Sequence, residues 1–301
     1  MKLLITGCDG QVGTELVRQA EAHGCQVLGV DRDQLDITDQ DAVNKAIQAY
    51  TPDAVVNAAA YTAVDKAENE RSAAYAVNAE AVSYLAQGCE NAGIPFVHIS
   101  TDYVFDGNKN GAYMENDAVC PLGVYGETKL AGEDAVRNIC EKYYILRTSW
   151  VFSAHGHNFV KTMLRLGAER EDLGVVGDQY GKPTSAAEIV HIIYLMLISG
   201  KGAWGTYHLA QPESTSWHGF AAAVFTEAKN QGMALQISNL RAIKTEEYPT
   251  PAKRPENSEL NCNKLENRFE LKIKPWTESL KEVIVEVQSV RTKAMLDMDD
   301  Q

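Results

Sequence analysis

The chain has 301 residues, a length that allows two domains or one large domain with an elaborated end. Hydrophobic residues make up 45% and charged residues 23%, as in an average globular protein, which excludes disorder, collagen and coiled coil as descriptions of the whole chain. With 28 Lys and Arg against 41 Asp and Glu, the net charge is −13, so no nucleic acid partner is expected.

The sequence also argues against a membrane protein. It contains no run of about 18 apolar residues, and its first apolar run, residues 3–6, is too short for the apolar region of a signal peptide. The six cysteines are scattered and form no Cys-x-x-Cys pair, which indicates reduced thiols and gives no support for zinc. We therefore expect a cytoplasmic protein with no membrane partner.

Short apolar runs alternate with helix-like stretches over the first half of the chain. Several runs are apolar at consecutive positions, which is typical of strands buried on both faces. Alternation at this spacing predicts a doubly wound α/β fold with a parallel sheet. The predicted strands are residues 3–6, 27–30, 54–58, 96–100 and 144–147, and the predicted helices are residues 11–23, 40–50, 72–92 and 124–141.

After about residue 150 the pattern changes, and Gly, Pro and Trp recur in irregular stretches. Further helices are predicted at residues 188–198, 217–231 and 279–290. We expect residues 1–150 to form the domain with the parallel sheet and residues 151–301 to form mainly a smaller α/β domain. The helices near 186–198 and 217–231 are candidates to pack back on the first sheet.

The first strand leads through Thr6-Gly7-Cys8-Asp9-Gly10-Gln11-Val12-Gly13 into a helix. A tight strand-to-helix turn needs a residue that tolerates positive φ, and a pyrophosphate needs backbone without side chains in its way. The helix N-terminus adds free N–H groups and a partial positive charge. The glycines in this context predict the phosphate-binding turn of a Rossmann-like NAD(P)-binding domain.

An acid at the tip of the second strand supports that prediction. Asp31 follows the last glycine by about 20 residues, where an acid hydrogen-bonds the ribose hydroxyls of adenosine and favours NADH. Arg32 comes next and could neutralise a 2′-phosphate, so NADPH stays open as well.

Tyr125 and Lys129 stand four residues apart, so on a helix they share one face. The pKa of a free phenol, about 10, is too high for proton exchange at neutral pH, and a nearby ammonium lowers it. Tyr125 could then act as general acid to a carbonyl oxygen as hydride arrives at the carbon. Tyr and Lys four residues apart are common on helices. This pair, however, lies on a later helix of the predicted fold that contains the glycine turn, which favours a catalytic role.

Polar residues also follow later strands, at the edge where open α/β sheets bind ligands. We expect Thr101 to hydrogen-bond a substrate carbonyl and Asp102 to contact the substrate or orient its neighbours. Arg147 and Arg254 are candidates for a substrate diphosphate, because a guanidinium binds phosphate bidentately, and salt-bridged arginine is the alternative.

The glycine spacing resembles that of the short-chain dehydrogenase/reductase superfamily. Longer strings resemble the dTDP-4-dehydrorhamnose reductase family over roughly residues 1–288. They are residues 56–68, 100–105, 124–133, 147–151, 158–163 and 251–258. The resemblance implies reduction of the C4 ketone of dTDP-4-dehydro-L-rhamnose by NADH or NADPH, the last step in making dTDP-L-rhamnose for bacterial surface polysaccharide.

The resemblance also implies roles for single residues. Tyr125 would donate the proton, Lys129 would hold the nicotinamide ribose, and Thr101 would be the third catalytic residue. The implied cofactor-binding residues are Gly7, Gly10, Gln11, Val12, Gly13, Asp31, Asp36, Ile37, Ala60, Tyr61, Thr62, Tyr125 and Lys129. The implied residues for the sugar nucleotide are Thr101, Asp102 and Trp150, to which we add Arg254.

Some members of that family dimerise through Mg²⁺ held by glutamates, which makes Mg²⁺ and a homodimer expectations here. Glu15 and Glu286 are the implied ligands. The third glutamate is displaced to Glu188 by one residue, which turns a helical side chain by about 100°. The alternative is that these glutamates bind no metal and are ordinary exposed acids on helix faces, which are common in a chain with a net charge of −13.

Two other functions stay open. A nucleotide-sugar epimerase or dehydratase of the same superfamily would keep its cofactor bound, whereas a reductase releases it at every turnover. The regulatory subunit of methionine adenosyltransferase resembles the same family and is not catalytic. The presence of Thr101, Tyr125 and Lys129 argues against that subunit.

Overall fold

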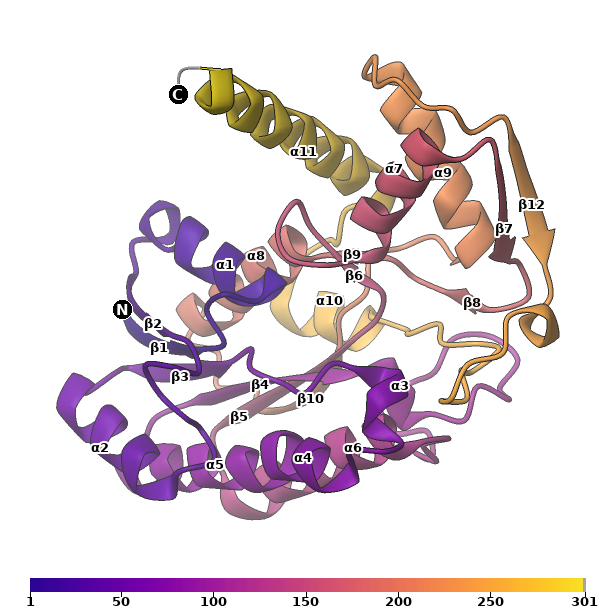
Figure 1. Ribbon diagram of the computed structural model, residues 1–301. Coiled ribbons are helices and arrows are strands. Elements are labelled where there is room, and N and C mark those ends of the chain that lie inside the picture. Colours follow the sequence, from indigo (N-terminus) through magenta and orange to yellow (C-terminus); the bar gives the residue numbers. More distant parts are fainter. Residues whose placement is uncertain (300–301) are drawn as a thin grey trace.

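A six-stranded sheet forms the centre of the molecule (Figure 1). The computed structural model describes residues 1–299, with side chains described through residue 290. The strand order is β10-β5-β4-β3-β1-β2, and every neighbouring pair is parallel. The strands are β1 (Lys2–Thr6), β2 (Gln26–Val30), β3 (Ala54–Asn57), β4 (Phe96–Thr101), β5 (Tyr143–Thr148) and β10 (Gly205–His208). The predicted doubly wound α/β fold is confirmed.

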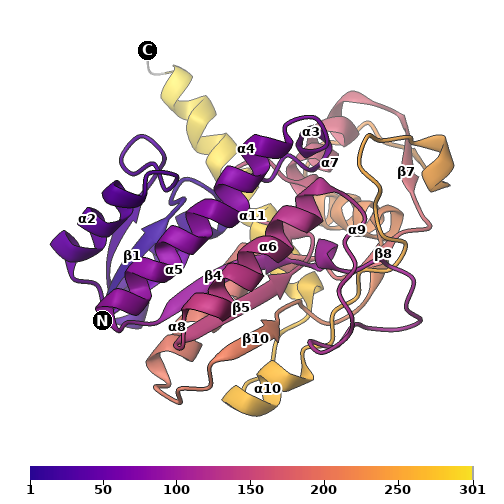
Figure 2. The same cartoon turned by 90° about the horizontal axis from the view of Figure 1, so that it is seen from below.

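Helices cover both faces of the sheet (Figures 1 and 2). One face carries α2 (Gln40–Tyr50), α5 (Ala81–Ala92) and α6 (Val124–Ile139), and the other carries α1 (Gln11–Gln19) and α8 (Ala186–Ile198). Successive side chains of a strand point to opposite faces, so Leu3 and Ile5 join the core under α1 and α8 while Leu4 joins the core under α2 and α5. Burial on both faces explains the consecutive apolar residues of these strands.

The predicted helix 72–92 is interrupted. It consists of α4 (Arg71–Tyr75), the π-helical turn η2 (Ala76–Glu80) and α5. A π-turn inside a helix frequently marks a functional site. Here it turns the buried side chain of Asn78 toward the loop after β3 and toward α6.

A second core lies beside the sheet and is built mainly from later residues. It contains α7 (Phe159–Glu169), α9 (Trp217–Asn230), the first part of α11 (Trp276–Asp299), and the parallel pair of β7 (Asp172–Val176) and β12 (Asn239–Ile243). The remaining elements are η1 (Glu21–His23), α3 (Val64–Ala67), η3 (Asp102–Val104), β6 (Val151–Phe152), β8 (Tyr180–Gly181), β9 (Thr184–Ser185), β11 (Thr215–Ser216), η4 (Thr245–Glu247) and α10 (Asn263–Phe269).

Two segments after residue 150 join the core of the first sheet. β10 forms its edge beside β5, and α8 packs against α1. α9 instead packs against α7 and α11. β10 was not predicted, because its sequence Gly-Thr-Tyr-His is short and only weakly apolar. Within residues 1–299 no helix is both long and apolar enough to cross a membrane.

Candidate active site

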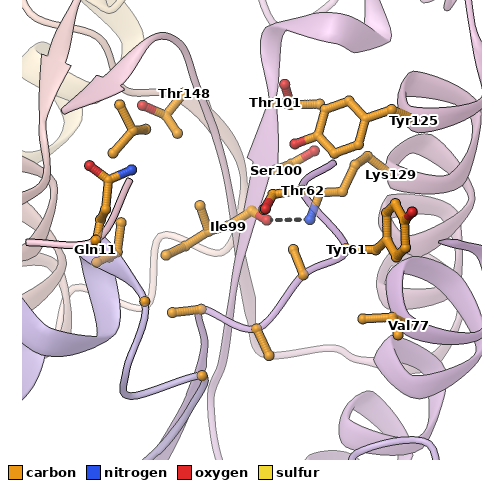
Figure 3. A pocket seen from close by; sticks show the side chains of 18 of the residues that line it. Gln11, Tyr61, Thr62, Val77, Ile99, Ser100, Thr101, Tyr125, Lys129 and Thr148 are labelled. Carbon is orange, nitrogen blue, oxygen red and sulfur yellow. Dashed lines mark hydrogen bonds between the residues drawn. The ribbon is translucent and has the colours of Figure 1, made fainter. Parts of the chain in front are cut away.

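A cavity of about 920 Å³ lies at the carboxyl ends of the central strands. It is the edge at which open parallel sheets bind ligands. Residues that follow β1 to β5 line it on one side, and Asn158 and Trp217 of the second core line it on the other. The cavity therefore lies between the two cores, and Figure 3 shows part of its lining.

The glycine turn forms one end of the cavity. Gly7 has φ +71°, and a Cβ there would lie 2.7 Å from the backbone of Ala59. Gly7, Gly10, Gln11 and Val12 line the cavity, and Gly10 is the N-cap of α1. Gly13 does not line the cavity. It has a packing role instead, because a Cβ there would lie 2.1 Å from the carbonyl oxygen of Gly7 and would push α1 away from the turn.

Carboxylates after β2 line the same end. Asp31 Oδ1 accepts hydrogen bonds from the backbone N–H groups of residues 33 and 34, both at 2.9 Å, which fixes this carboxylate at the strand tip. Hydrogen bonds from the hydroxyl and N–H of Thr38 lower the pKa of Asp36. Arg32 also lines the cavity, so a carboxylate and a guanidinium both lie at the tip of β2. Ile37, Ala60, Tyr61 and Thr62 complete the predicted cofactor lining.

Tyr125 and Thr101 lie together on the cavity wall (Figure 3). Tyr125 is in the first turn of α6, and Thr101 is the last residue of β4. Burial raises the pKa of Tyr125 to about 12, although a hydrogen bond with Thr101 acts in the opposite direction. The Thr101 hydroxyl donates to Asp102 Oδ1 at 2.9 Å. The three side chains therefore form one connected group.

Asp102 is 2% exposed and lines the cavity. Burial raises its pKa to about 6, against the hydrogen bonds from Ser258 and Thr101. Its second oxygen, Oδ2, has no hydrogen-bond partner among the described residues. A buried acceptor without a partner is costly, which disfavours the charged form of this carboxyl group.

Lys129 lies one helical turn after Tyr125 and is 2% exposed. Its Nζ donates to the carbonyl oxygen of Ile99 at 2.7 Å (Figure 3). Burial lowers the pKa of Lys129 to about 8, while the charge of Glu133 acts in the opposite direction. We expected Lys129 to lower the pKa of Tyr125. Instead, burial dominates at both groups and disfavours both charged forms.

The predicted arginines do not line the cavity. Arg147 is 2% exposed, and its Nε and Nη2 donate to the Glu133 carboxylate at 2.9 and 2.7 Å. Burial acts to raise the pKa of Glu133, but the hydrogen bonds and charge of Arg147 outweigh it and the pKa is lowered. Arg147 is thus a buried ion-pair residue, and the expectation that it meets a diphosphate is wrong. Arg254 binds Asp65 at 2.9 Å, so its role in substrate binding stays a prediction.

Trp150 lines the cavity, as expected, and has φ +48°, a conformation that costs energy for a bulky residue. Its ring stacks on that of Trp217, with centroids 3.5 Å apart and an interplanar angle of 9°. The two rings together form an aromatic wall between the two cores.

The comparisons with known proteins agree with this geometry. The RmlD substrate binding domain family matches residues 1–289. The dTDP-4-dehydrorhamnose reductase of Escherichia coli strain K12 is 43% identical over 295 residues, covering 95% of this chain and 98% of that protein. The chain belongs to the dTDP-4-dehydrorhamnose reductase family.

Solved structures of the reductase family have the same fold. A dTDP-4-dehydrorhamnose reductase from Clostridium acetobutylicum superposes with a TM-score of 0.90 at 41% identity, covering 96% of this chain and all of that one. A second, from Bacillus anthracis in complex with NADP, gives a TM-score of 0.89 at 36% identity, with coverage of 95% and 99%. The glycine cradle of this chain fits such a dinucleotide, because side chains are missing where the backbone must approach it.

The two glutamates expected to bind magnesium lie close together, but they already have a cationic partner in Arg18. Oxygens of Glu15 and Glu286 and a ring nitrogen of His155 lie within 4.8 Å of one another. Arg18 Nη1 contacts all three, at 3.2 Å from Glu15, 2.5 Å from Glu286 and 2.7 Å from His155. The guanidinium supplies the positive charge there, so the arrangement does not fit Mg²⁺. Within the described residues, Glu188 does not join this group.

Several lining residues of this reductase-family site were not expected from the sequence. Thr148, Ser149 and Asn158 line the cavity together with Trp217. Thr148 is paired in register with Thr101, which is the signal that could have found it. No local pattern marks Trp217, because its place at the cavity depends on the packing of α9.

Proposed function

We propose that this protein reduces the C4 ketone of dTDP-4-dehydro-L-rhamnose with NADPH or NADH and releases dTDP-L-rhamnose. The observation that carries the proposal is the meeting of Tyr125, Thr101 and Lys129 with the glycine turn in one cavity. The sequence identity of 43% to a dTDP-4-dehydrorhamnose reductase supports the choice of substrate.

The chain's own groups account for the proton and for orientation. A reduced nicotinamide, when bound, supplies the hydride. Tyr125 donates its phenolic proton to the C4 oxygen, and Thr101 hydrogen-bonds the same oxygen and polarises the carbonyl. Lys129 holds the ribose next to the nicotinamide. Asp102 and Trp150, which line the same cavity, contact the sugar nucleotide.

The proposal extends to the roles of the two parts of the chain and to the compartment in which the enzyme works. We propose that residues 1–150 mainly bind the dinucleotide and residues 151–301 mainly bind the sugar nucleotide. The six cysteines are free, which supports a reducing, cytoplasmic setting. A homodimer and a surface polysaccharide as the destination of the product stay predictions, and the contacts of Arg18 weigh against Mg²⁺.

The test is the loss of reduced-nicotinamide absorbance when the purified protein meets dTDP-4-dehydro-L-rhamnose, with NADPH and NADH in parallel. Tyr125→Phe is expected to lower kcat by about 10²-fold or more and to leave cofactor affinity roughly unchanged. Near-normal turnover in that variant would mean that another group donates the proton. No turnover with either cofactor, from protein that binds both, would contradict the proposal and favour a binding subunit or another sugar nucleotide.

A further inference from the structure

A chain of buried polar side chains runs behind the cavity from β1 to α6. It consists of Thr6 on β1, Asn57 on β3, His98 on β4 and Lys129 on α6, and each is at most 2% exposed. Of the four, only Lys129 lines the cavity. The proposed reaction uses Lys129 and gives no role to the other three.

Hydrogen bonds in this chain determine the tautomer of His98. Asn57 Oδ1 accepts from the Thr6 hydroxyl at 2.7 Å and from the backbone N–H of Ala59 at 3.1 Å. A backbone N–H can only donate, so the amide oxygen must face Ala59 and the amide nitrogen must face His98. Asn57 Nδ2 lies 3.1 Å from His98 Nδ1 and donates to it. His98 is therefore a neutral imidazole with its proton on Nε2.

His98 Nε2 lies 3.4 Å from Lys129 Nζ. A charged ammonium has only N–H groups, so next to Nε2–H it would place two donors face to face. A neutral amine has a lone pair that accepts from Nε2–H, and it can still donate to the Ile99 carbonyl at 2.7 Å. The geometry thus favours the neutral amine.

The surrounding charges do not reverse this preference. Burial also favours the neutral lysine, and Glu133 opposes it. The Glu133 carboxylate is already shared by Arg147, Arg137 and the Ser100 hydroxyl. The other titratable side chains beside Lys129 on the cavity wall are Tyr61 after β3 and Tyr125 of α6 (Figure 3).

We propose that His98 is a positioning residue for Lys129: its Nε2–H holds the lysine amine beside Tyr125 and favours the neutral form until the dinucleotide binds. The ribose hydroxyls and the negative charge of the bound dinucleotide then favour the ammonium. The neutral fraction of Lys129 therefore takes a proton from solvent onto Nζ as the cofactor binds. The inference rests on the proposed function for the identity of that ligand.

Calorimetry of cofactor binding counts this proton. NADPH is titrated at pH 8 into the whole protein in two buffers of different ionisation enthalpy, and NADH is run in parallel because it lacks the 2′-phosphate. Because the pKa of Lys129 is about 8, we expect uptake of about half a proton per cofactor bound.

Three variants separate the role of His98 from general packing. His98→Leu removes the donor and is expected to reduce the uptake by about twofold or more. His98→Gln keeps one acceptor for Asn57 and one donor for Lys129, so it is expected to retain the uptake. Val97→Ala shortens a buried side chain on the opposite face of the same strand, outside the cavity lining, and is expected to leave the uptake unchanged.

No uptake in the wild-type protein, or equal uptake in wild type and His98→Leu, overturns the proposal. Should His98→Leu fail to fold, ¹⁵N NMR of labelled histidines in the wild type decides, with His98→Gln identifying the signal. A protonated Nε2 with a bare Nδ1 supports the proposal, and a protonated Nδ1 overturns it. Neither measurement uses the sugar nucleotide, so a failed reductase assay leaves both valid.

Discussion

Asp102 and Lys129 are buried and Tyr125 is partly buried at one wall of the cavity, and loss of hydration moves the pKa of each toward its neutral form. The unfolded chain hydrates these groups freely, so their charged forms cost folding free energy. A ligand that brings a complementary partner recovers this cost on binding. The effect can be measured at Asp102, because its carboxylate changes charge at accessible pH.

The pKa of Asp102 is about 6 in the folded protein, above its ordinary 3.8, so the folded state binds the proton more tightly than the unfolded state. The carboxylate therefore lowers stability increasingly as pH rises from about 4 to 6, and the full penalty is present above that. Asp102→Asn is expected to raise the free energy of unfolding by up to about 3 kcal/mol at pH 8 and about half as much at pH 5. Urea unfolding at both pH values measures the gain.

Asp106→Asn is the matched control for that substitution. A backbone N–H and other hydrogen bonds lower the pKa of Asp106, which is only partly buried, so this variant should lose stability at pH 8 rather than gain it. Asp102→Asn should at the same time weaken the reductase reaction by raising KM for the sugar nucleotide. An equal gain at pH 5 and pH 8 would show that charge burial at Asp102 is not the cause.

Cofactor preference is a second property of single residues. Asp31 and Arg32 both line the cavity after β2, and an acid there disfavours a 2′-phosphate while an arginine favours it. Asp31→Asn is expected to shift the ratio of kcat/KM for NADPH over NADH upward by about tenfold, and Arg32→Gln to shift it downward. Steady-state kinetics with both cofactors measures the ratio. A ratio that neither variant changes would place the adenosine ribose elsewhere.

The π-turn η2 connects two segments beside the cavity, the loop after β3 and the helix α6. Asn78 Oδ1 accepts from the backbone N–H of Tyr61 at 2.8 Å, and its Nδ2 donates to Thr128 on α6 at 3.1 Å. The same turn brings the Asn78 carbonyl against Gly132, where a Cβ would lie 2.2 Å away. The loop after β3 and the helix of Tyr125 are thus positioned by one turn.

Gly132→Ala tests that contact. The added methyl group must push α6 away from η2, so we expect a loss of about 1–3 kcal/mol in the free energy of unfolding and a higher KM for the cofactor. Urea unfolding and steady-state kinetics measure the two effects. Asn138→Ala, on the exposed face of the same helix, should change stability by less than about 0.5 kcal/mol. Similar results for both variants would mean that the contact at Gly132 is unimportant.

The elements that the sequence predicted are those whose pattern is local. Residues 54–57 and 144–146 lie within real strands, and both strands are buried on both faces, which requires mainly apolar residues. The π-turn was not predictable, since Ala-Val-Asn-Ala-Glu contains no helix breaker and long-range hydrogen bonds hold it. The ion pair of Arg254 with Asp65 likewise joins residues 189 positions apart.

Across the whole molecule, the cavity depends on how the two cores are held together. Arg18 on α1 of the first core binds Glu286 on α11 of the second, and His155 in the loop between them joins the contact. Glu15, which is 4% exposed, depends on the same guanidinium. This group of residues therefore links the cores at the glycine-turn side of the cavity.

Arg18→Met tests both the link and the magnesium expectation. Losing the guanidinium leaves Glu15 and Glu286 facing each other, so we expect a loss of about 1–2 kcal/mol in the free energy of unfolding. In the wild type Arg18 supplies the charge, so EDTA or added Mg²⁺ should leave Tm unchanged. In the variant the cation can bind between the carboxylates, so millimolar Mg²⁺ should raise Tm.

Arg165→Met, which removes an exposed ion pair on α7, is the control, and its Tm should respond to neither EDTA nor Mg²⁺. A Tm that falls on adding EDTA to the wild type would contradict the assignment of Arg18 and restore Mg²⁺ to this site.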